Sequence, residues 1–124
     1  VRKAQQASVL IQRYHQVKND PERLAALDRI NDLYRGLECR HDARLGLAVF
    51  ITKADLTIPK ALSFGANVII EVDAKGFGKI LKCKVGSPGE RMTAVDLARS
   101  FNFSLTVPDG LRLTRWAAID EDWI

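Results

Sequence analysis

The sequence predicts a single α+β domain: an N-terminal antiparallel helical hairpin packed on a small, mostly antiparallel sheet of about five strands, with one further helix. Apolar residues recur every three or four positions over residues 1–38, and short apolar or alternating runs bounded by turn residues follow over 45–124. The 124 residues, 47% hydrophobic and 27% charged, have the proportions of one globular domain. Because the chain begins at Val1 and ends on Ile124, we expect it to be a fragment of a longer protein.

The first two elements are predicted helices over residues 2–18 and 21–38. The stripe of the first helix consists of Ala4, Ala7, Ile11 and Tyr14, with Leu10 and Val17 beside it. The residue before a proline is driven out of the helical region, so Asp20 suits an N-cap and Pro21 the first helical position. The short loop between two amphipathic helices favours an antiparallel hairpin.

After residue 41 the apolar period shortens. Residues 45–52 read as a strand, and 59–63 as one helical turn that ends at Gly65. The further predicted elements are strands over 67–73 and 79–85, a helix that starts at Thr93, and strands over 103–107 and 111–116. Residues 93–107 also have some character of a helix-turn-helix, but the turn at 108–110 breaks its second helix, so we prefer the strands.

The two strands around residue 76 form a predicted hairpin with a basic second strand. Matching their apolar faces requires that the numbers of opposed residues sum to an odd value, which places Glu71 opposite Lys82 or Lys84. Either register predicts cross-strand ion pairs, which are ordinary sheet stabilisers and account for most of this charge.

The charge of the chain is uneven. The net charge is +4, yet residues 93–124 are acidic, so the excess of cations lies in the first two thirds. At the tip of the predicted hairpin, Lys75 and Lys79 flank Phe77, an arrangement that suits phosphate contact and base stacking. We expect Lys53 and Arg91 nearby, and this basic tip is the predicted site of contact with DNA or RNA.

A second pattern points to metal chemistry. Asp73-Ala74-Lys75 places a carboxylate and an ammonium on one face of a strand, and with an upstream carboxylate such as Asp55 or Glu38 it suits Mg²⁺ and a hydrolytic water. The order of elements over 22–107 also resembles, in topology, the core of the PD-(D/E)xK nucleases. The resemblance implies metal-dependent phosphodiester cleavage by Asp55, Asp73 and Lys75. The sequence departs from that pattern, since Asp55 does not follow a proline and Asp73 ends the second strand rather than lying on the third.

The leading functional prediction is a non-catalytic interaction module without a cofactor. The apolar stripe of the first helix is wide for one partner helix, so Leu10, Ile11, Tyr14 and Val17 are its predicted interface with a protein partner or a second copy. The nuclease is the alternative.

The cysteines and the apolar pattern bear on the compartment. Cys39 and Cys83 form neither a metal spacing nor a disulfide framework, which favours reduced thiols in a cytoplasmic protein. We find no apolar run long enough to cross a membrane, and the polar residues 1–6 are unlike a signal peptide.

Overall fold

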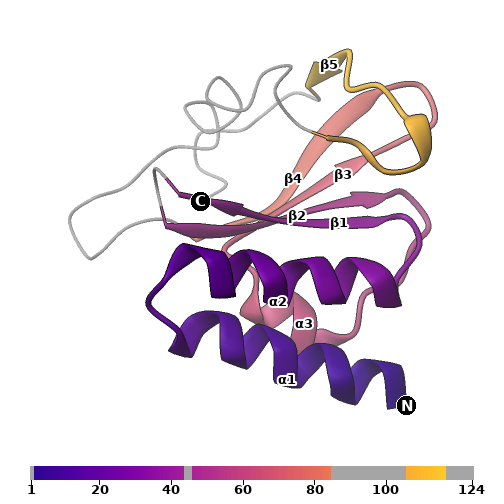
Figure 1. The fold of residues 1–124 in the computed structure, drawn as a ribbon. Coiled ribbons are helices and arrows are strands. Elements are labelled where there is room, and N and C mark those ends of the chain that lie inside the picture. Colours follow the sequence, from indigo (N-terminus) through magenta and orange to yellow (C-terminus); the bar gives the residue numbers. More distant parts are fainter. Residues whose placement is uncertain (1, 44–45, 85–105, 117–124) are drawn as a thin grey trace.

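The computed structural model describes residues 2–43, 46–84 and 106–116 and confirms the α+β class (Figure 1). The elements are α1 (Arg2–Gln16), α2 (Asp20–Leu33), β1 (Leu37–Asp42), β2 (Leu47–Lys53), α3 (Lys60–Gly65), β3 (Val68–Val72), β4 (Phe77–Cys83), the 3-10 helix η1 (Pro108–Gly110) and β5 (Arg115–Trp116).

The sheet has the strand order β1-β2-β3-β4-β5 and is mixed. β1 and β2 are antiparallel, as are β3 and β4, whereas β2 runs parallel to β3 and β4 parallel to β5. The prediction of a mostly antiparallel sheet therefore holds for half of the pairings. The reason is α3, because a helical crossover returns the chain to the same end of the sheet and makes β2 and β3 parallel.

The helical hairpin is confirmed, and both of its helices end earlier than predicted. Asn19, not Asp20, is the N-cap of α2, since its side chain accepts a hydrogen bond from the Glu22 amide (2.9 Å). The prediction of a helix to residue 38 is wrong: α2 ends at Leu33, and after Gly36, whose φ is +86°, the chain enters β1. A strand over residues 37–42 was not predicted.

Each face of the sheet carries a buried apolar cluster. α1, α2 and α3 cover one face, and the segment 106–116 lies over the other (Figure 1). On the helical face, Phe50 and Ile69 pack in one cluster with residues of all three helices. On the opposite face, the alternate residues of β2 and β3 form a second cluster with Ile80 and Leu113. This explains why β2 is an unbroken apolar run.

A bulge decides the register of β3 and β4. Val68 and Ile69 pair with Cys83 and Lys82, but beyond them Ile70 pairs with Ile80 and Glu71 with Lys79, so Leu81 is an extra residue. The predicted opposition of Glu71 with Lys82 or Lys84 is therefore wrong. Strict alternation along β4 predicts Ile80 on the face of Lys82 and Lys84, but Ile80 is buried and Leu81 is 41% exposed. The ion pairs within the described residues do not include the predicted ones between β3 and β4.

The predicted helix from Thr93, most of the predicted strand over 103–107 and Arg91 lie outside the described residues, and the two described residues of that strand, Thr106 and Val107, are not in a strand. Of the predicted strand over 111–116, only Arg115–Trp116 is a strand. In the described ranges, every helix is too short or too polar to cross a membrane.

Candidate functional site: a groove on the helical layer and a basic hairpin tip

A groove runs between α1 and α3, the "helical groove". Ile11, itself buried, forms its floor, and Phe64 is 83% exposed at its rim. The two helices meet closely because a Cβ atom on Gly65 would stand 2.5 Å from Ile11 Cγ1. His15 Nε2 also donates to the Gly65 carbonyl (2.6 Å). The residues that line the groove are Ser8, Ile11, Gln12, His15, Gln16, Lys60, Ala61, Phe64 and Gly65.

A lysine from β4 holds the end of α3 that carries Phe64. Lys82 Nζ donates to the carbonyls of Ser63 (3.0 Å) and Phe64 (2.9 Å), and it lies 5.6 Å from the centroid of the Phe64 ring. Partial burial and, secondarily, the charge of Lys84 lower the pKa of the Lys82 ammonium. The backbone at Phe64 is therefore held in place, and its exposed ring lies beside a cation.

Of the predicted interface residues of α1, two lie in the core and two are half-buried near the surface. Ile11 and Tyr14 are each only 2% exposed and belong to the chain's own core. Leu10 is half-buried and lines a second groove, between α1 and α2, beside Val9, which is 64% exposed. Val17 is half-buried after the end of α1, where its carbonyl accepts from Arg23 Nε (3.0 Å). The apolar stripe thus builds the core, while Phe64, which sequence reasoning missed, stands on the surface.

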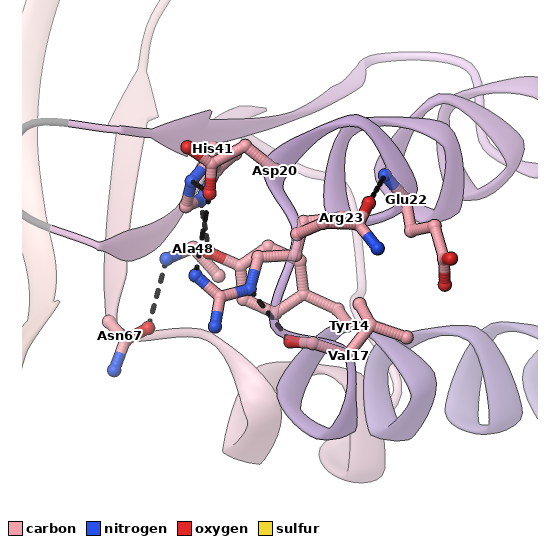
Figure 2. A network of polar contacts seen from close by, with 9 residues as sticks. Tyr14, Val17, Asp20, Glu22, Arg23, His41, Ala48 and Asn67 are labelled. Atoms are coloured by element: carbon pink, nitrogen blue, oxygen red, sulfur yellow. Dashed lines mark hydrogen bonds and ion pairs between the residues drawn. The ribbon is translucent and has the colours of Figure 1, made fainter.

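A partly buried polar network joins the helical hairpin to β1 (Figure 2). The Tyr14 hydroxyl and His41 Nδ1 are 2.6 Å apart, and His41 Nε2 lies 3.1 Å from a carboxylate oxygen of Asp20. Asp20 also pairs with Arg23 at 3.6 Å, and the Arg23 guanidinium lies over the Tyr14 ring. With Nε2 protonated, the histidine donates to the carboxylate and accepts from the phenol, so every group is paired.

This network resembles a catalytic relay in composition but not in properties. Tyr14 is 2% exposed, so a substrate has no access to its hydroxyl. Burial raises the pKa of Tyr14 from 10.0 to about 12, with Arg23 opposing and Asp20 and Asp42 adding to the rise. A nucleophile or base requires the opposite shift. The network therefore positions the hairpin against the sheet.

The basic hairpin tip gains residues that the sequence did not indicate. Lys75 and Lys79 are exposed, as predicted for a contact surface. Phe77 is half-buried, and the Arg115 guanidinium lies 4.8 Å from its ring centroid. Gly76 contacts the backbone of Arg112, because a Cβ atom there would stand 2.5 Å from that residue's carbonyl oxygen. The parallel pairing of β4 with β5 thus brings two arginines to the tip.

Lys53 does not join this cluster as a free cation. Its Nζ pairs with a carboxylate oxygen of Asp109 at 2.9 Å. Asp109 lies in η1 with a φ of +55°. The pair links the end of β2 to the segment that covers the second face of the sheet.

The residues of the nuclease hypothesis meet at one end of the sheet without forming a metal site. Ala54 donates to the Val72 carbonyl (3.0 Å), so Asp55 and Asp73 both follow adjacent parallel strands. A carboxylate oxygen of Asp73 accepts from the amides of Lys75 (2.9 Å) and Phe77 (3.0 Å), which makes it the cap of the turn. Over residues 2–43, 46–84 and 106–116, we find no group of three His, Cys, Asp or Glu residues able to hold a metal.

Both thiols are free and poorly suited to nucleophilic chemistry. Burial, and to a smaller degree Glu38, raises the pKa of Cys39, and burial raises the pKa of Cys83. The thiolate is the reactive form, so both cysteines are held in their inert form.

Comparison of the chain with protein-family models, with curated proteins and with solved structures finds no match. Two surfaces of the described residues are the candidates for function: the helical groove and the basic hairpin tip.

Proposed function

We propose that this chain is a non-catalytic interaction module that binds a protein partner through the helical groove. The observation that carries the proposal is the position of Phe64, 83% exposed at the rim of a groove whose floor is Ile11. Burying a phenylalanine side chain contributes about 1.5–3 kcal/mol, and aromatic residues in pockets are typical anchors of interfaces. Lys82 holds the backbone beneath this ring, so the anchor is positioned before a partner arrives.

The state of the nucleophilic side chains supports a binding role over a catalytic one. Tyr14 and Cys39 are buried and held protonated by burial, and Cys83 is shifted in the same direction. The Asp73 carboxylate is engaged by two backbone amides.

Two matched charge substitutions test the proposal. Phe64→Glu places a carboxylate at the groove, and Val9→Glu makes the same kind of change at another exposed apolar position of the helical layer. The measurements are quantitative co-purification of partner proteins from the cells that make the chain, and self-association by light scattering. We expect Phe64→Glu to abolish the binding that the wild type shows, and Val9→Glu to keep it. Equal retention of partners by both variants, with both folded by circular dichroism, contradicts the proposal.

A second candidate function is contact with nucleic acid at the basic tip. The observation that favours it is the convergence of Lys75, Lys79, Arg112 and Arg115, all exposed, from two segments of the chain. Backbone phosphates are bound by such clusters, and each contact with duplex DNA contributes a slope of about −0.9 to the dependence of log affinity on log salt.

Affinity for labelled DNA and RNA, measured over a salt series with and without Mg²⁺, tests this candidate. We expect Lys75→Gln and Lys79→Gln each to reduce the salt slope by about one phosphate contact, and Lys60→Gln on α3 to leave it unchanged. Undetectable affinity at low salt removes the nucleic-acid role. Cleavage that requires metal and disappears with Asp73→Ala favours the nuclease instead.

A further inference from the structure

The helical groove is formed by elements that contain cations and no carboxylates. Its lining includes the cation Lys60 and no Asp or Glu residue, and neither α1 nor α3 contains an acidic residue anywhere along its length. Lys82 of β4, which donates to the α3 carbonyls, adds a further cation beside Phe64. The nearby charge of Lys84 contributes to lowering the pKa of Lys82. By contrast, the second groove of the helical layer is lined by both signs of charge: Asp32 from α2, a helix with four acidic residues, and Arg2 and Arg29.

From this charge pattern we propose that the helical groove binds an acidic segment of a partner protein that carries a bulky apolar anchor residue. The inference rests on the proposed function and names the chemistry of its partner. Complementary charge steers such a segment to the groove and disfavours basic partners.

The groove offers separate contacts for the two parts of this segment. An apolar anchor packs against Phe64, Ala61 and the Ile11 floor. Carboxylates of the same segment meet Lys60, which lines the groove and is exposed. The amide side chains of Gln12 and Gln16 and the hydroxyl of Ser8, on the opposite wall, supply uncharged hydrogen-bonding groups.

Fluorescence anisotropy with three labelled peptides tests the inference on the whole chain. The first peptide has glutamate and aspartate residues around one tryptophan and one leucine. In the second, every carboxylate is replaced by its amide, and in the third by lysine. We expect the acidic peptide to bind about tenfold or more tightly than the amide version, and the basic peptide to bind weakest.

Variants locate the binding. Phe64→Ala should weaken the acidic peptide about tenfold or more, as for an interface anchor. Lys60→Glu should weaken it to a similar degree, whereas Lys79→Glu, the same charge change at the hairpin tip, should leave it within about twofold. An equal loss with Lys60→Glu and Lys79→Glu overturns the inference, because the attraction would then come from the overall charge of the chain.

The failure of this inference is distinguishable from the failure of the proposed function. If the amide or basic peptide binds as tightly as the acidic one, the partner chemistry is wrong and the groove remains a binding site. If none of the peptides binds but Phe64→Glu still abolishes co-purification, the inference alone is overturned. If Phe64→Glu changes neither peptide binding nor co-purification, both are overturned.

Discussion

At the scale of single residues, Asn31 has a role that its position on α2 does not suggest. Its side-chain oxygen accepts from the Cys39 amide (2.6 Å) and its side-chain nitrogen donates to the Cys39 carbonyl (3.1 Å). An asparagine side chain has the same donor and acceptor as a peptide group, so it pairs with this strand residue as a neighbouring strand would. It thereby ties α2 to β1.

Replacing Asn31 with alanine should lower the free energy of unfolding by about 1–3 kcal/mol, because a partly buried amide and carbonyl lose their partner. Urea denaturation measures this loss. The control is Asp32→Ala, an exposed neighbour on the same helix, for which we expect a change within about 0.5 kcal/mol. Equal effects of the two substitutions would contradict the role of Asn31.

Tyr14 should make stability sensitive to alkaline pH. Its pKa is raised from 10.0 to about 12, so the folded state favours the protonated phenol; this contribution is complete below pH 10.0 and is lost as the pH rises toward about 12. Urea denaturation at several alkaline pH values should show the wild type losing up to roughly 2 kcal/mol more than Tyr14→Phe, since one pKa unit corresponds to about 1.4 kcal/mol. Equal losses of stability in the wild type and in Tyr14→Phe would contradict this prediction. Tyr34→Phe is the comparison, because burial also raises the pKa of Tyr34.

At the scale of elements, patterns that local chemistry determines were predicted well and those that depend on distant contacts were not. Helix α1, the hairpin turn and strands β2 and β3 follow from apolar period and turn residues. β1 was missed because Leu37 continued the helical spacing of α2, whereas Asn31 and the pairing with β2 select a strand there. The extra residue Leu81 reversed the assigned faces of β4, and nothing in its neighbours marks a bulge.

The contact between α1 and α3 gives a prediction with a defined sign. Alanine is intrinsically better than glycine in a helix by about 0.5–1 kcal/mol. At position 65, however, the new methyl group would stand 2.5 Å from Ile11 Cγ1, so we expect Gly65→Ala to destabilise the protein.

A double-mutant cycle separates these effects. In the Ile11→Ala background the clashing atoms are absent, and Gly65→Ala should then be neutral or stabilising. Thermal or urea denaturation of the four proteins measures the coupling. A cost of Gly65→Ala that is unchanged in the Ile11→Ala background would show that the contact is not its cause.

At the scale of the whole molecule, the sheet lies between two layers of different construction. Helices cover one face, and the second face is met by the segment 106–116, which contains little regular structure (Figure 1). The class and the helical layer were predictable, because each follows from a repeated pattern. The basic tip was predicted only in part, since Arg112 and Arg115 are brought to Lys75 by the fold from a separate segment.

Gly76→Ala should loosen the segment 106–116. The substitution places a Cβ atom 2.5 Å from the Arg112 carbonyl and 2.6 Å from Thr114 Oγ1, in addition to the strain of a φ of +88°. Gly46→Ala is the control, because its φ is +68° and nothing lies within 4 Å of its Cβ position.

We expect Gly46→Ala to cost about 1–2 kcal/mol and Gly76→Ala clearly more. In a Trp123→Phe background, Trp116 is the single tryptophan, so its fluorescence emission reports the detachment of the segment 106–116 from the sheet. Equal losses of stability for the two substitutions, with unchanged emission, would show that the close approach at Gly76 does not contribute to stability.

The hydrogen bonds of Asn31 also bear on the behaviour of the protein at high concentration. β1 is the last strand on its side of the described sheet, and an unpaired strand of this kind is a template on which another chain can add. The asparagine occupies the backbone groups of Cys39 in the middle of that template. Slow hydrolysis of its amide to a carboxylate would remove the donor to the Cys39 carbonyl, so chemical ageing at this one side chain would leave the middle of the edge strand less protected against pairing with another chain.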